Sequence, residues 1–141
     1  MLKNIPSILS PELLKILMEM GHGDEIVIAD GNFPSANYGQ RLVRLDGHGV
    51  PVILEAILDL MPLDIYVDAP VALMEVVKGD TFVPEIWETY KKIVKEKEGD
   101  KKIENVERFA FYDRAKEAYA VVATGETSLY ANIILKKGVV V

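Results

Sequence analysis

The chain has 141 residues, of which 50% are hydrophobic and 27% are charged, which suits one folded domain spanning residues 1–141. It contains no cysteine, which excludes disulfides, thiolate nucleophiles and cysteine-ligated zinc. Its formal net charge of −6 argues against a nucleic-acid partner, because phosphate affinity comes mainly from clustered lysine and arginine.

Hydropathy along the chain predicts a cytoplasmic protein with no membrane partner. No apolar run approaches the roughly 20 residues that a membrane-spanning helix needs. The N-terminal stretch "MLKNIPSILSPELL" lacks the continuous apolar segment and small-residue cleavage site of a signal peptide. The densest basic stretch, "YKKIVKEKEGDKK", is interleaved with acidic residues, which is typical of a solvated helix face.

The first half of the chain shows alternating helix and strand signals. Ser10 and Pro11 are a typical start for a helix, and Gly21 is a typical stop. The apolar run "EIVIA" that follows is typical of a strand covered on both faces, and it ends at Asp30. We predict a loop over "GNFPSANYGQ", a strand over "RLVRL", and a second helix that opens at Pro51.

The second half continues the alternation. It contains two strand candidates, "DIYV" and "ALMEVV", then a helix from Pro84 to about Glu96, the strand "KIENV", the helix "ERFAFYDRAKEA", and the strands "YAVVATG" and "NIILKKG". This alternation predicts an α/β fold, with a sheet covered by helices on both faces in three layers. About seven residues join the last two strands, too few for a helical crossover, so we predict an antiparallel pair within a mixed sheet.

The chain has only two histidines, and each lies between glycines. His22 precedes the apolar strand and Asp30 follows it; ligand clefts usually form at strand ends in open α/β sheets. The pair would supply an acid/base group and a carboxylate, although a turn residue and a loop cap would look the same. His48 fits an ordinary turn before a helix, with a phosphate site at the helix start as the weaker alternative.

A metal site is a further alternative for these residues. Two histidines with Asp30 or Asp46 could bind zinc or iron. No spacing resembles a known metal motif, however, and the ligands would have to come from separate loops. We therefore expect no metal.

Three residues of the C-terminal third favour a small polar ligand. Tyr130 and Asn132 are two apart, so in an extended segment they point to one side and could bind hydroxyls; an edge tyrosine beside a turn asparagine is the alternative. Arg108 begins a predicted helix, where the helix dipole disfavours a cation, so it is a candidate for another role. These patterns do not define a reaction.

Four stretches together resemble the fucose mutarotase branch of the D-ribose pyranase / fucose mutarotase family. They are "LSPELLKILMEMGHGDEIVIADGNFP", "PLDIYV", "RFAFYDRAKEAYAVVATGE" and "LYANIILKKGV". The resemblance runs from Leu2 to Val139, and none of the four stretches is a generic motif.

The resemblance implies an isomerase that interconverts the α and β anomers of L-fucose, with no metal and no organic cofactor. It implies that His22 of the "MGHGD" motif is catalytic and that Asp30 and Arg108 contact the sugar. Arginine rather than histidine before "FAFY" favours the fucose branch. The Tyr-x-Asn segment of the family falls on Tyr130, Ala131 and Asn132. The family also implies a ring-like homo-oligomer, often a decamer, with sites near subunit boundaries.

The chemistry of mutarotation suits these residues. One group removes the anomeric hydroxyl proton while another protonates the ring oxygen, and we expect His22 and Tyr130 to be the two proton carriers. Because fucose is a 6-deoxy sugar, its site needs an apolar wall, for which Phe33 and Trp87 are candidates. Two other functions remain open: ribose pyranase activity, and a non-catalytic sugar-binding accessory of a transport system. His48 has no role implied by the family.

Overall fold

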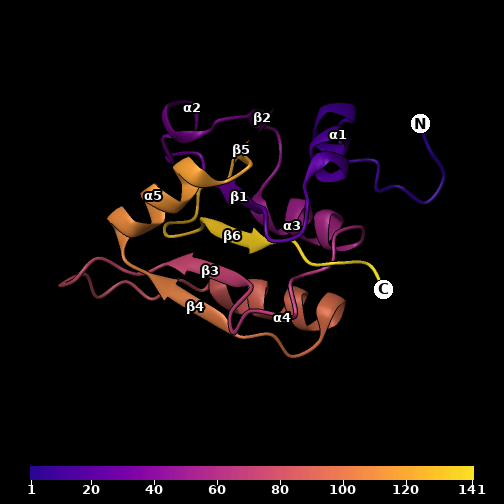
Figure 1. The fold of residues 1–141 in the computed structure, drawn as a ribbon. Helices are drawn as coiled ribbons and strands as arrows, with labels where there is room; N and C mark the ends of the chain where they lie inside the picture. The colour runs from indigo at the N-terminus through magenta and orange to yellow at the C-terminus, as the bar shows by residue number, and fades with distance from the viewer.

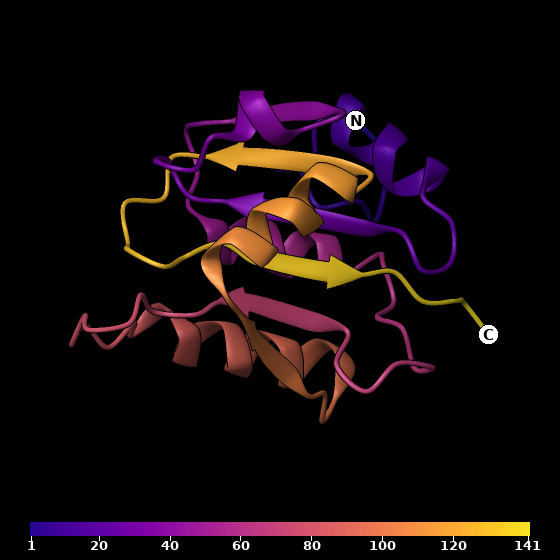
Figure 2. The same cartoon turned by 60° about the vertical axis from the view of Figure 1, so that its left-hand side comes forward.

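Six strands form one mixed sheet in a computed structural model that describes residues 1–141. The strands are β1 Glu25–Ala29, β2 Leu42–Leu45, β3 Val71–Met74, β4 Ile103–Val106, β5 Ala120–Thr124 and β6 Ile133–Lys136. Their order across the sheet is β2-β5-β1-β6-β3-β4. Only β6 runs against its neighbours β1 and β3, and Figure 2 shows its yellow arrow reversed beside theirs.

Five helices cover the two faces of the sheet (Figure 1). They are α1 Pro11–Glu19, α2 Ser35–Tyr38, α3 Val50–Leu58, α4 Ile86–Glu98 and α5 Arg108–Glu117. Side chains alternate between the two faces of a strand. Accordingly, Ile26 and Ile28 of β1 join a core with α1, α3 and α4, while Val27 and Ala29 join a second core with α5. The predicted three-layer α/β fold with a mixed sheet is confirmed.

Most of the helix boundaries follow from local signals. The Ser10 hydroxyl accepts a hydrogen bond from the Leu13 N–H at 3.2 Å, which caps α1 as predicted. The predicted loop "GNFPSANYGQ" is partly wrong, because Pro34 leads into the single turn of α2, closed by a Gly39 N–H to Ser35 C=O bond of 2.8 Å. The third predicted helix begins at Ile86 rather than Pro84 and continues to Glu98.

Two strand predictions need correction. Residues 64–67 are not a strand, because the Asp64 carboxylate accepts the Tyr66 N–H at 3.0 Å and bends the chain in an Asx turn. The candidate "ALMEVV" ends as a strand at Met74, and the chain then turns through residues 77–80.

The pairing predicted for the last two strands is also wrong, although their opposite directions are as expected. β1 lies between β5 and β6 and bonds to both, parallel to β5 and antiparallel to β6. The connection between β5 and β6 therefore passes over the carboxyl end of β1, instead of forming a hairpin. This crossing places the loop of residues 125–132 next to the carboxyl end of β1, which Asp30 directly follows.

Candidate functional site

A cavity of about 350 Å³ opens at the carboxyl edge of the sheet. Four predicted residues with polar side chains line it: Asp30, Arg108, Tyr130 and Asn132. They come from the end of β1, the start of α5 and the loop before β6, so segments far apart in the chain meet at one edge. This is the edge at which open α/β sheets usually bind ligands.

Hydrogen bonds from the backbone N–H groups of Asp30 and Gly31 fix the loop of residues 125–132 over the end of β1. The Asp30 N–H donates to the Asn132 side-chain oxygen at 2.7 Å, and the Gly31 N–H donates to the Glu126 carbonyl at 2.9 Å. Because the oxygen of Asn132 is used in this way, its amide NH₂ is the group that remains for a ligand.

Asp30 is a buried carboxyl at the mouth of this arrangement, with 8% of its surface exposed. Burial raises its pKa above the ordinary value, against the opposing effect of backbone N–H groups such as that of Asn32. A buried carboxyl that faces a polar cavity is suited to accept hydrogen bonds from ligand hydroxyls.

The backbone of the Tyr-Ala-Asn segment is held from behind by α4. The Trp87 indole N–H donates to the Tyr130 carbonyl at 2.8 Å, and the Tyr90 hydroxyl donates to the Ala131 carbonyl at 2.7 Å. Tyr130 adopts the left-handed region, with φ of +56°, which costs free energy that these bonds offset. Ala131 is fully buried, its carbonyl is occupied by Tyr90, and its N–H is directed to the Asp30 carboxylate, where it favours a lower pKa for Asp30, so its role is to hold the segment in place.

Arg108 is the first residue of α5, as predicted. The Glu107 carboxylate accepts hydrogen bonds from the Phe109 and Ala110 N–H groups. Its negative charge offsets the unfavourable interaction between Arg108 and the positive end of the helix dipole. The Arg108 Nε donates to the Tyr112 hydroxyl at 3.2 Å, which raises the pKa of Arg108 and keeps it charged. A fixed cation at the rim of the cavity is suited to donate to sugar hydroxyls.

His22 lies elsewhere, in the turn between α1 and β1, where Gly23 has a left-handed φ of +87°. Its Nε2 lies 3.0 Å from Oδ1 of Asp64, and its ring packs at 5.5 Å from that of Tyr66. The Tyr66 N–H bond and the His22 bond hold the pKa of Asp64 below its ordinary value. Asp64 was not predicted from the sequence; its only signal was its place in "PLDIYV".

The predicted pairing of His22 with Asp30 does not occur within one chain. His22 precedes β1 and Asp30 follows it, and at about 3.3 Å per residue a five-residue strand spans roughly 15 Å. For the same reason, a metal site that combines His22 with Asp30 does not form here. We call the His22, Asp64 and Tyr66 group the histidine corner, and the cavity at the other edge the carboxyl-edge cavity.

His48 lies in an exposed turn before α3. The alternative of a phosphate at this helix start is wrong, because Glu126 already occupies it: its Oε1 accepts the Val50 N–H at 3.1 Å. Burial favours a higher pKa for Glu126. Hydrogen bonds from Ser128 and from nearby backbone N–H groups have a larger combined effect and keep this pKa below its ordinary value.

The two apolar-wall candidates differ in position. Phe33 lines the carboxyl-edge cavity and is 8% exposed. Trp87 does not line it, since its ring packs against the core beneath α4 and its N–H bonds to Tyr130. Phe33 therefore remains the better candidate for an apolar contact.

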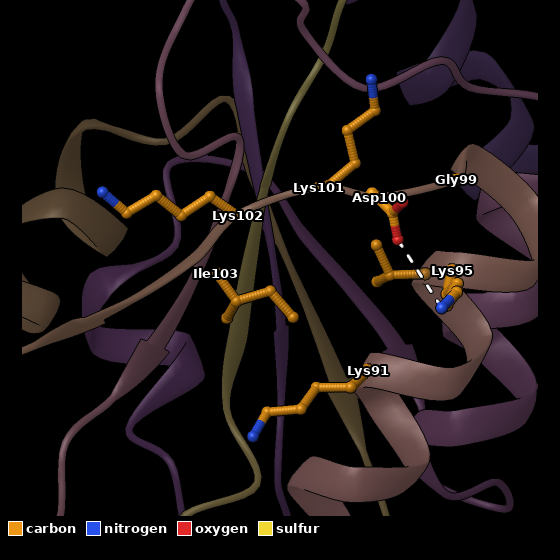
Figure 3. Close-up of a pocket in the computed structure, with 8 residues that line it drawn as sticks. Lys91, Lys95, Gly99, Asp100, Lys101, Lys102 and Ile103 are labelled. Atoms are coloured by element: carbon orange, nitrogen blue, oxygen red, sulfur yellow. Dashed lines mark ion pairs between the residues drawn. The ribbon is translucent and has the colours of Figure 1, made fainter.

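A second cavity, of about 320 Å³, lies between α4 and β4 and is lined by Lys91, Lys95, Lys101 and Lys102 (Figure 3). The predicted site residues are not among its lining. Lys95 pairs with Asp100 at 3.7 Å near the end of α4, where the helix dipole favours cations. The basic stretch thus behaves as the solvated helix face that its sequence predicts.

Comparison with known proteins assigns the family. Residues 3–140 match the model of the RbsD / FucU transport protein family, so the chain belongs to this family. It is 54% identical over 140 residues to the L-fucose mutarotase of Actinobacillus pleuropneumoniae, covering 99% of this chain and 97% of that protein. No helix of the structure has the length and apolar character needed to cross a membrane.

Solved structures separate the two branches of the family. The fucose mutarotase of Streptococcus pneumoniae in complex with L-fucose is 59% identical, with a TM-score of 0.96 over 99% of this chain and all of that one. RbsD of Bacillus subtilis complexed with D-ribose is 28% identical, with a TM-score of 0.74 over the full length of both chains. This chain is therefore much more similar to the fucose mutarotase than to the ribose-bound protein.

Proposed function

We propose that the protein is an L-fucose mutarotase, an isomerase that interconverts the α and β anomers of the sugar. The observation that carries this proposal is the carboxyl-edge cavity, where Asp30, Arg108, Tyr130 and Asn132 meet around a space of monosaccharide size. The similarity to the L-fucose-bound protein supports fucose over ribose as the substrate.

The reaction needs two proton transfers. One group takes the proton of the anomeric hydroxyl, the C1–O5 bond of the ring breaks, and another group protonates the ring oxygen. The free aldehyde then rotates and closes on its other face with the transfers reversed. General acid/base catalysis of this kind contributes about 10²–10⁴-fold, and the proposal assigns it to side chains of the two regions.

The histidine corner sets which nitrogen of His22 acts on the sugar. Asp64 with a lowered pKa is ionised near neutral pH, and an ionised carboxylate can only accept hydrogen bonds. His22 therefore carries its proton on Nε2 toward Asp64, and Nδ1 is the nitrogen that exchanges a proton with the substrate. The carboxylate also stabilises the imidazolium that forms when Nδ1 is protonated.

We infer that each complete site contains two copies of the chain. A monosaccharide bound by Asp30 and Asn132 cannot reach the His22 of the same chain across the length of β1. The histidine corner contains exposed Tyr66 and lies beside exposed Ile65, and the carboxyl-edge cavity has exposed Leu129 in its lining and exposed Phe109 next to Arg108. Head-to-tail contact between two such unlike faces generates a ring where the rotation between copies closes. We therefore propose a ring-like homo-oligomer, a decamer, located in the cytoplasm.

Saturation transfer between the two anomeric proton resonances of L-fucose tests the proposed function. We expect catalytic amounts of the protein to produce transfer that is absent without it. Transfer that appears only between the pyranose and furanose forms of D-ribose would instead identify a pyranase. Binding of L-fucose with no transfer for either sugar would contradict an enzymatic function and favour the sugar-binding accessory.

A further inference from the structure

The turn of residues 77–82 lies directly over the hydroxyl group of Tyr130. The Tyr130 hydroxyl donates to Oδ2 of Asp80 at 2.7 Å, and the Val77 N–H donates to the Tyr130 oxygen at 3.3 Å. The Phe82 ring is stacked on the Tyr130 ring, with centroids 6.0 Å apart and an interplanar angle of 29°. One short turn thus contacts the phenol at its oxygen and along its ring.

Asp80 is fixed by its own turn. Its Oδ1 accepts the Phe82 N–H at 2.9 Å, and its N–H donates to the Val77 carbonyl at 2.9 Å. Gly79 supplies the left-handed φ of +94° that the turn requires. The carboxylate is therefore oriented by the backbone, and its second oxygen is presented to Tyr130.

These bonds decide what Tyr130 offers to the cavity. A phenol has one proton to donate and accepts through its oxygen lone pairs. The proton is directed to Asp80 and one acceptor direction is used by the Val77 N–H, which leaves one acceptor direction of the phenol oxygen for a ligand. The bond to Asp80 raises the pKa of Tyr130, and the positive charge of Arg108 opposes that rise.

We propose that Asp80 is a positioning residue that turns the Tyr130 proton away from the cavity, so that Tyr130 accepts a hydrogen bond from a sugar hydroxyl. This inference rests on the proposed function, since it assigns the direction in which Tyr130 exchanges protons. Tyr130 then takes the anomeric proton while its own proton passes to Oδ2 of Asp80, and His22, with both ring nitrogens protonated and Nε2–H held by Asp64, gives its Nδ1 proton to the ring oxygen. Ring closure on the other face reverses these transfers.

Asp80→Asn is the sharpest test of this proposal. The asparagine keeps its Oδ1 for the Phe82 N–H, so the turn is preserved, but its NH₂ replaces the oxygen that faced Tyr130. The phenol then has to accept from Asn and direct its proton into the cavity. We expect the rate of anomer exchange to fall about tenfold, the range of a hydrogen bond to a charged group. Asp100→Asn, at an exposed carboxylate beside Lys95, is the matched control.

Two readouts decide the outcome. In the Tyr130→Phe background Asp80→Asn should cause no further loss of rate, and an equal loss in both backgrounds would overturn the inference. The ultraviolet phenolate signal that Tyr130→Phe removes gives the titration midpoint of Tyr130. Asp80→Asn should lower this midpoint, and an unmoved midpoint would overturn the inference whether or not the protein exchanges anomers. A wild-type protein without exchange would overturn the proposed function alone.

Discussion

The two ends of β1 are built in opposite ways. At the carboxyl end, Asp30 and Asn132 are buried and tied to the backbone of the loop that crosses the strand. At the amino end, His22 has 44% of its side chain exposed, and its side-chain hydrogen bond is to Asp64, beside the Tyr66 ring. The carboxyl end is thus a rigid, partly buried polar surface, whereas the amino end presents one imidazole outward. This difference suits the proposal that the two regions meet between subunits.

His22→Ala should have the largest effect, because it removes the proton carrier but leaves the carboxyl-edge cavity intact. We expect anomer exchange to fall by about 10³-fold, within the usual range for loss of a general acid/base. L-Fucose binding, measured by calorimetry, should change little. His48→Ala is the matched control, since it removes the other histidine that lies between glycines, and it should leave both quantities unchanged. An equal loss of exchange rate in His22→Ala and His48→Ala would contradict the assignment of the proton transfer to His22.

Asp64→Asn sharpens the role of the histidine corner. The amide cannot stabilise the imidazolium of His22 as a carboxylate does, so we expect the exchange rate to fall about tenfold. Asp64 has a lowered pKa in the folded state, so its contribution to stability is present above its unfolded-state pKa and is lost as the pH falls through the folded-state value. Thermal unfolding from pH 7 to pH 3 should show this loss for the wild type and a smaller one for Asp64→Asn. Asp68→Asn, on the same segment but exposed, should behave as the wild type.

Asp30→Asn should have the smallest of the three expected effects, and it should be a gain rather than a loss of stability. Burial raises the pKa of Asp30, so the stability that its protonated form contributes is lost as the pH rises through that folded-state value. A neutral amide removes this cost at pH 7, and we expect the melting temperature to rise by about 3 °C. L-Fucose binding should weaken at the same time. A lower melting temperature would show that the carboxylate stabilises the fold.

The sequence was most informative where a single local signal suffices. Ser10 and Pro11 predicted the start of α1, and the apolar run that ends at Asp30 predicted β1. The pairing of β5 and β6 was not predictable in this way, because a short connection looks the same whether it forms a hairpin or crosses over an inserted strand.

The contacts that orient the proposed proton carriers were missed for a similar reason. Asp64 lies 42 residues from His22, and Asp80 lies 50 residues from Tyr130, so no spacing along the chain connects them. Both aspartates occupy turns, where a carboxylate that accepts a backbone N–H two residues later is an ordinary feature. Only the folded structure shows that the same carboxylates also bond to His22 and Tyr130.

Mixed oligomers test the central claim most directly, since that claim is a site made of two chains. His22→Ala and Arg108→Ala each disable one of the two regions, and each variant alone should be nearly inactive. If every site combines the histidine corner of one chain with the carboxyl-edge cavity of another, random co-assembly of the two variants restores about one site in four. The account predicts that co-expressed variants regain about a quarter of the wild-type exchange rate. Co-assembled oligomers that stay as inactive as the separate variants would contradict it.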